Sequence, residues 1–165
     1  MNDDLKCVSV GDLLARYSTI LDELERRNVI RARNAPAGDH AERLCARALG
    51  GSLLANSQKS ADVVFDDGTT VQVKCRVVSD PIRTGERQMS VFRSWNFELA
   101  AFVLLDRSSY RVRHGVLLPA HIVESSARSV GHVNGHRFIL NGPMLNHPDA
   151  QDITEALRSA ADAHA

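Results

Sequence analysis

The chain begins with two stretches in which apolar residues recur with the period of a helix. Over residues 11–27 the apolar positions share one face and the charged positions fall elsewhere, which predicts an amphipathic helix. A second helix is predicted from about 40 to 49, capped by Asp39 and ended at Gly50-Gly51. Between them, residues 34–38 have the composition of a loop. The chain is therefore expected to have an N-terminal helical arm, 1–33, followed by a core, 34–165.

After residue 50 the pattern changes to short apolar runs and alternating positions, which are typical of strands. Strands are predicted at 52–55, 61–65, 71–78, 100–105 and 111–118, and a short one at 137–140. Helices are predicted at 119–128 and 151–162. The fold class is therefore α/β (α+β), a single compact domain with a mixed sheet of about five strands flanked by helices.

The strand expected at 71–78 has one apolar and one polar face, and the polar face carries Gln72, Lys74 and Arg76. The side on which Asp62 lies depends on the turn that joins its strand to this one. A two-residue turn would direct Asp62 toward the apolar face, at a cost of several kcal/mol for a charged carboxylate. A three-residue loop with Gly68 left-handed instead pairs Asp62 with Gln72. We therefore expect Asp62, Gln72 and Lys74 to share one polar face.

These three side chains have the chemistry of a phosphodiester-cleaving site. A carboxylate and an amide carbonyl are hard oxygen donors suited to Mg²⁺ or Mn²⁺, and a nearby ammonium can orient a water and offset charge in the transition state. Glu42 lies at the edge of the buried stripe of the 40–49 helix. If that helix packs beside the hairpin, its carboxylate can approach the same ion.

Glu42, Asp62 and Gln72-Val73-Lys74, on a helix and two successive strands, resemble the PD-(D/E)XK nuclease superfamily, in a variant with Gln at the second acidic position. The resemblance covers about 40 residues, from Gly38 to Arg76, and implies a restriction-endonuclease-like core. It implies that Asp62 is the principal metal ligand, with a second ligand from Gln72 or the Val73 main-chain carbonyl. Lys74 would orient the water, and Glu42 would be the accessory carboxylate. A neutral Gln72 implies weaker metal binding than an acidic residue would give.

The charge distribution favours a local rather than a general nucleic-acid surface. The whole chain has 20 Lys and Arg against 20 Asp and Glu, so DNA binding must come from a patch. The segment from Gln72 to Arg93 has such a surplus, and its candidate phosphate contacts beside Lys74 are Arg76, Arg83, Arg87 and Arg93. Residues 79–93 show no periodicity and are expected to form a loop, which Phe92 and Trp95 either anchor to the core or extend as a stacking surface.

Each site residue also has a purely structural interpretation. Glu42 stands three residues after Asp39, as in a capping box, and the hairpin's polar residues are also typical of a solvated face. The histidines of the 131–138 segment have H-x3-H spacing, but two flanking glycines and the lack of further ligands favour a loop. His121, near a predicted helix start, is interpreted as a surface histidine.

Three functional hypotheses follow from these patterns. The first is a Mg²⁺-dependent DNA endonuclease, and the second is an inactive module on the same fold that binds nucleic acid or a protein partner. The third is a partner protein that oligomerises through the 11–27 helix, and a homodimer is compatible with all three. No apolar run is long enough to span a bilayer, no export signal is evident, and Cys7, Cys45 and Cys75 form no close pair, so a cytoplasmic protein without disulfides is expected.

Overall fold

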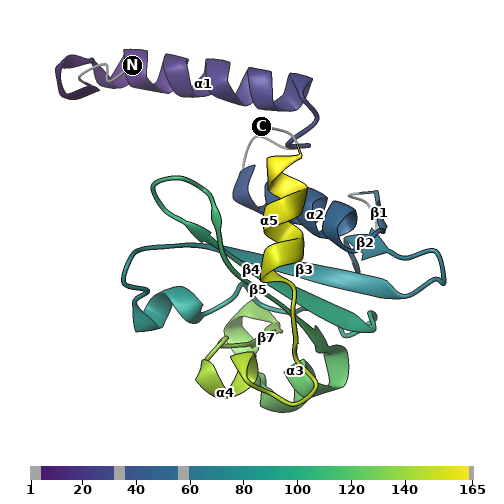
Figure 1. The fold of residues 1–165 in the computed structure, drawn as a ribbon. Coiled ribbons are helices and arrows are strands. Elements are labelled where there is room, and N and C mark those ends of the chain that lie inside the picture. Colours follow the sequence, from purple (N-terminus) through teal and green to yellow (C-terminus); the bar gives the residue numbers. More distant parts are fainter. Residues whose placement is uncertain (1–4, 32–35, 56–59, 164–165) are drawn as a thin grey trace.

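The fold is built on a six-stranded mixed sheet with helices on both faces (Figure 1). The computed structural model describes residues 5–31, 36–55 and 60–163, without the side chains of residues 10, 11 and 13–15. The strand order is β1-β2-β3-β4-β5-β8. The strands are β1 (Ser52–Leu53), β2 (Val63–Val64), β3 (Thr70–Val78), β4 (Leu99–Asp106), β5 (Val112–Pro119) and β8 (Gln151–Asp152). The expected α/β class is confirmed.

The centre of the sheet consists of the three long strands. β3 and β4 are parallel, whereas β4 and β5 are antiparallel. A parallel pair cannot be joined by a tight turn. The chain therefore crosses from β3 to β4 through residues 79–98, which include the 3-10 helix η2 (Thr84–Arg87) and pack over one face of the sheet.

The two faces of the sheet have separate hydrophobic cores. Helices α2 (Pro36–Ala48) and α5 (Thr154–Asp162) cover the face to which Val71, Val73 and Val103 point. Helices α3 (Ala120–Ser126) and α4 (Gly142–Leu145) lie on the opposite side, together with the 88–97 segment, in the core that contains Phe102 (Figure 1). Because β4 is covered on both sides, every residue from 100 to 105 is buried.

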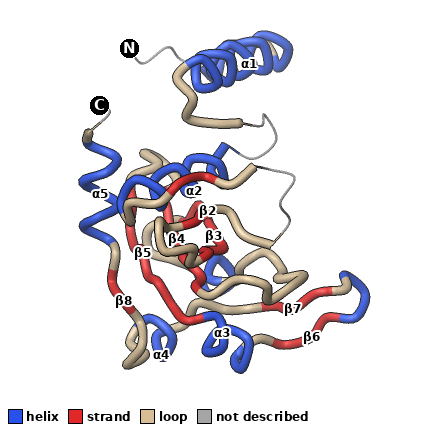
Figure 2. The backbone as a smooth tube through the Cα atoms, turned by 90° about the vertical axis from the view of Figure 1, so that its right-hand side faces the viewer, coloured by secondary structure: helices blue, strands red, loops and turns tan. Residues whose placement is uncertain are grey.

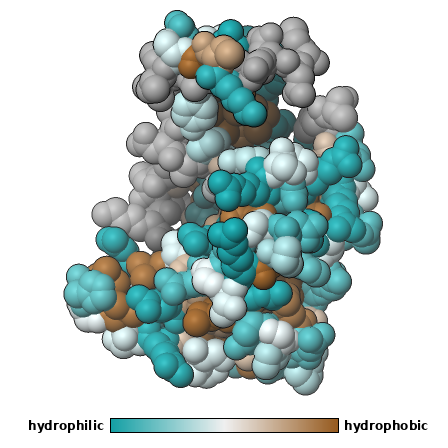
Figure 3. Space-filling view, turned by 90° about the vertical axis from the view of Figure 1, so that its left-hand side faces the viewer, coloured by the Kyte–Doolittle hydropathy of each residue, from teal (hydrophilic) through white to brown (hydrophobic). Residues whose placement is uncertain are grey.

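The N-terminal helix α1 (Val10–Arg26) is found within one residue of its predicted bounds, after the short 3-10 helix η1 (Leu5–Cys7). Its residues Tyr17 and Ile20 are 48% and 57% exposed, while Leu21 is buried. Hydrophobic residues gather in the hollow beneath α1 (Figure 3), where an apolar groove of about 330 Å³ separates α1 from α2. Leu13 and Leu14 are among the apolar positions from which this helix was predicted, and they lie outside the described side chains.

The predicted start of the second helix was wrong. The helix begins at Pro36, which suits the first helical turn because proline lacks the N–H that has no partner there. Asp39 is therefore inside the helix and accepts a hydrogen bond from the backbone N–H of Arg31 (2.6 Å). Asp39 is not the N-cap, so the expected capping box of Asp39 and Glu42 is wrong. Of the expected loop at 34–38, residues 34 and 35 lie outside the described residues, and the rest is helical.

The C-terminal third contains more short helices and strands than the sequence predicted. A hairpin of β6 (Arg128–Val130) and β7 (Gly135–Arg137) replaces the strand expected at 137–140 (Figure 2). The 3-10 helix η3 (Gly131–Val133) and Asn134, with a left-handed φ of 47°, form its turn. The helix expected at 151–162 is preceded by β8, because residues 151 and 152 pair with β5. In the part of the chain described, no helix is long and apolar enough to span a membrane.

Candidate functional site

The hairpin formed by β2 and β3 brings Asp62 to Gln72. Phe65 N–H donates to Thr69 O (2.9 Å), and Gly68 N–H donates back to Phe65 O (3.0 Å), which encloses a three-residue loop. Gly68 has a φ of 87°, which glycine adopts without the steric penalty of other residues. Val63 pairs with Val71, so Asp62 lies opposite Gln72. The predicted loop and register are therefore confirmed.

The Asp62 carboxylate is held at the edge of β3. Its Oδ2 accepts hydrogen bonds from Gln72 Nε2 and from the backbone N–H of Val73, the latter at 2.7 Å. Because the N–H and C=O of one strand residue point to the same side, the Val73 carbonyl faces this edge as well. Burial raises the pKa of Asp62, although the Val73 N–H and the charges of Lys74 and Arg31 oppose the rise.

Lys74 lies on the same face of β3 as Gln72 and is held by the crossover segment. Its Nζ donates to the carbonyl oxygen of Val91 (3.1 Å) and stands 4.7 Å from the centre of the Phe92 ring. Burial lowers the pKa of Lys74, while the charge of Asp62 acts in the opposite direction and that of Arg93 adds to the decrease. Lys74 therefore affects Asp62 through its charge, without forming an ion pair with it in the described structure.

Glu42 reaches the site from α2, on the opposite face of the sheet. Its side chain is only 18% exposed, and its Oε2 accepts a hydrogen bond from Arg31 Nη2. Burial raises the pKa of Glu42 to about 7, the charge of Asp62 adds to the rise, and Arg31 partly offsets it. The two carboxylates are thus close enough to interact, one from each side of the edge of β3.

Arg31 belongs to the site, although it was not among the residues predicted to form it. Besides Glu42, its guanidinium donates to the carbonyl oxygen of Leu54, directly after β1 (2.8 Å). Arg31 lies in a connecting segment without periodicity, 31 residues before Asp62 in the chain. No pattern in the sequence indicates that Arg31 lies near Asp62, because only the packing of α2 against the sheet brings the two residues into one region.

The donor atoms at this edge are of the types that Mg²⁺ prefers. Two carboxylates and the Val73 carbonyl are hard oxygen donors, and Mg²⁺ commonly takes few protein ligands and keeps several waters. Gln72 uses its amide N–H toward Asp62, so its predicted role as an oxygen ligand stays a prediction. Within residues 5–31, 36–55 and 60–163, no group of three or more His, Cys, Asp or Glu side chains is placed to hold a metal. Any ion would therefore depend on the two carboxylates, the Val73 carbonyl and water.

The predicted arginine patch lies on an ordered segment rather than a free loop. Met89 and Phe92 are 2% and 1% exposed, and Phe92 stacks on Trp95 with ring centres 4.9 Å apart. Phe92 therefore anchors the segment to the core, which was one of the two predicted roles. Strand β7 pairs with this segment through a bridge between Phe92 and His136.

Both acidic residues of the 72–93 segment are already paired. Asp80 accepts two hydrogen bonds from Arg113 (3.1 Å each), and the Glu86 carboxylate accepts bonds from Ser79 and from the Arg83 backbone. The charge of Asp80 is therefore balanced by Arg113, which lies outside the segment, whereas Glu86 still interacts with the charge of Arg83. Arg76, Arg83 and Arg93 are exposed, whereas Arg87 is half-buried and donates to Leu140 O (3.4 Å).

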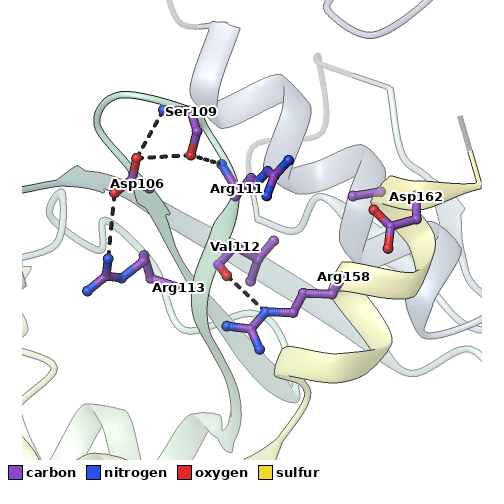
Figure 4. A pocket seen from close by; sticks show the side chains of 8 residues that line it. Asp106, Ser109, Arg111, Val112, Arg113, Arg158 and Asp162 are labelled. Carbon is purple, nitrogen blue, oxygen red and sulfur yellow. Dashed lines mark hydrogen bonds and ion pairs between the residues drawn. The ribbon is translucent and has the colours of Figure 1, made fainter. Parts of the chain in front are cut away.

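A cavity of about 560 Å³ lies between the β4–β5 turn and α5, and none of Asp62, Lys74 and Glu42 lines it (Figure 4). Three arginines line it, but two of them are already paired. Arg113 binds Asp80 and lies 3.7 Å from Asp106, and Arg158 binds Glu155 and the Val112 carbonyl. The cavity therefore offers little unpaired charge to a ligand.

The remaining histidines and cysteines lie in several different elements. His132 and Asn134 lie in the turn of the β6–β7 hairpin, and His136 lies in β7 beside Trp95 (5.5 Å between ring centres). His121 is exposed on α3. Cys45 is fully buried and Cys75 partly buried, and burial raises the pKa of Cys75 to about 12, which keeps the thiol protonated.

Comparison of this chain with known proteins gives no match, either to a family model or to a curated protein.

Proposed function

We propose that this protein is a Mg²⁺-dependent nuclease of the PD-(D/E)XK type that hydrolyses phosphodiester bonds in DNA. The observation that carries the proposal is the placement of Asp62. It is fixed at the edge of β3 by Val73 and Gln72, and it lies within electrostatic reach of Glu42 and Lys74. Sites of this composition combine metal ligation with a positioned ammonium.

In this proposal each residue has a distinct role. Asp62, the Val73 carbonyl and Glu42 would hold the ion, which supplies a Lewis acid and an activated water when it is bound. Lys74, whose pKa is lowered by burial, releases its proton more readily than a free lysine, so a larger fraction is neutral and suited to orient the attacking water. The exposed arginines 76, 83 and 93 would hold the phosphate backbone.

A second candidate function is a module on the same fold that binds nucleic acid or a protein partner without cleaving. The observation that favours it is that the polar groups of the site satisfy one another. Gln72 N–H donates to Asp62, and Lys74 donates to Val91 O. Such pairing stabilises a metal-free state and requires rearrangement before either group meets a substrate.

The test is a cleavage assay with an Asp62→Ala variant and a matched control. Supercoiled, linear, single-stranded and methylated DNA are incubated with the protein and Mg²⁺ or Mn²⁺. Asp66→Ala is the control, because Asp66 is an exposed aspartate in the loop of the same hairpin. We expect the wild type and Asp66→Ala to cleave DNA and Asp62→Ala to be inactive.

Two other outcomes have different meanings. Equal cleavage by Asp62→Ala and the wild type would contradict the nuclease assignment. If the wild type leaves all DNA forms intact with either ion, yet binds DNA with an affinity that falls as salt rises, the second candidate is favoured.

A further inference from the structure

Arg31 links helix α2 to the segment directly after β1. Its backbone N–H donates to Asp39 within α2, its Nη1 donates to the Leu54 carbonyl after β1, and its Nη2 donates to Glu42. The side chain is 30% exposed, so the guanidinium lies at the border between the site and solvent. Two hydrogen bonds hold the guanidinium, and a third holds the backbone of the same residue.

The position of Arg31 solves an electrostatic problem of the metal-free site. Glu42 and Asp62 are both largely removed from water and repel each other, so both require positive charge nearby. Arg31 acts on both carboxylates and makes direct contact with Glu42, whereas Lys74 acts on Asp62 from the other side. Direct contact with Arg31 occupies a carboxylate that the proposed metal centre would need.

We propose that Arg31 is a positioning residue that serves as the internal counter-cation of this centre, holding Glu42 in the absence of a divalent ion and competing with the ion for that carboxylate. The inference rests on the proposed function. A guanidinium keeps its charge at all working pH values, so the competition does not depend on protonation of Arg31. Arg31 would then set the concentration of ion at which Glu42 becomes a ligand.

Removing Arg31 should have opposite effects on two measurements. Without its partner Glu42 is a buried, unpaired carboxylate, so the metal-free protein becomes less stable. The same carboxylate is released to the ion, so ion binding becomes tighter. A residue that merely holds α2 to β1 would, when removed, weaken both properties.

The experiment compares Arg31→Met with the wild type at pH 8. Mn²⁺ affinity is measured by calorimetry on metal-free protein, and stability by urea unfolding in EDTA. Arg43→Met is the matched control, because Arg43 follows Glu42 on α2 and affects His40 rather than the carboxylates. We expect Arg31→Met to bind Mn²⁺ on the order of tenfold more tightly and to unfold at lower urea, while Arg43→Met binds Mn²⁺ within about twofold of the wild type.

Unchanged or weaker Mn²⁺ binding by Arg31→Met, with a wild type that does bind Mn²⁺, would overturn this inference alone. An equal gain in affinity in Arg43→Met would also overturn it, because any nearby cation would then have the same effect. Absence of Mn²⁺ binding in all three proteins would overturn the metal centre and the role of Arg31 together. If Arg31→Met does not fold, Arg31→Lys replaces it, with an expected gain of about threefold because lysine makes a weaker contact with a carboxylate.

Discussion

The strongest quantitative prediction concerns the pH dependence of stability that Glu42 creates. Burial and the charge of Asp62 raise the pKa of Glu42 from 4.5 to about 7 in the folded protein. The unfolded chain releases this proton near pH 4.5, whereas the folded protein holds it until about pH 7. Between these values the unfolded state binds fewer protons, so the free energy of unfolding falls as pH rises.

The size of the effect follows from the same two values. At 1.36 kcal/mol per pH unit, the difference between 4.5 and about 7 corresponds to about 3 kcal/mol. Because the Glu42 side chain is only 18% exposed, solvent screening reduces this figure little. This decrease in the free energy of unfolding is absent below pH 4.5 and complete above pH 7.

The assay is urea unfolding of the wild type and Glu42→Gln at several pH values from 4.5 to 8, in EDTA. Glutamine has the shape of glutamate but does not titrate, so the stability of the variant relative to the wild type should rise across this window by up to about 3 kcal/mol. Glu155→Gln is the control, because Glu155 also pairs with an arginine but its side chain is 81% exposed. A constant difference between Glu42→Gln and the wild type would refute the reasoning.

Three further predictions concern the frame of the site, and urea unfolding measures stability in each. Gly115→Ala should cost about 1–3 kcal/mol, because the new Cβ would lie 2.2 Å from Leu157 Cδ1, while Gly131→Ala, with open space around it, should cost far less. Gly68→Ala should cost about 1–2 kcal/mol, because alanine is strained at a φ of 87°. Gln72→Glu should destabilise the metal-free protein by about 1–3 kcal/mol, yet bind Mn²⁺ more tightly in calorimetry, because it adds a charged ligand and removes an internal hydrogen bond.

Local chemistry explains which parts of the fold were predictable. The loop before β3 was predicted correctly because only one loop length keeps the charge of Asp62 away from the apolar face, and Gly68 permits the backbone that this loop needs. The alternation in β3 likewise indicated which side chains share the face of Lys74. These features depend on residues near one another in the chain.

Features that depend on distant contacts were predicted only in part. Anchoring of the crossover segment by Phe92 was one of two predicted roles, but the bridge between Phe92 and His136 had no signal in the sequence. The predicted start of α2 was wrong because Asp39 was interpreted as the N-cap. A proline in the first helical turn is an equally good signal, and the helix begins at Pro36. Arg31 had no signal at all, because its partners come from α2 and the end of β1.

The glutamine at position 72 is understandable from the charges around it. A third acidic side chain there would face Asp62 directly, at an edge where repulsion already helps to raise the pKa of Glu42 to about 7. Gln72 instead donates a hydrogen bond to Asp62, which gives this carboxylate a partner in the metal-free site. The same feature that stabilises the empty state lowers the attraction for a divalent ion. The balance between these effects, rather than the presence of the side chains, therefore decides between the nuclease and the binding module.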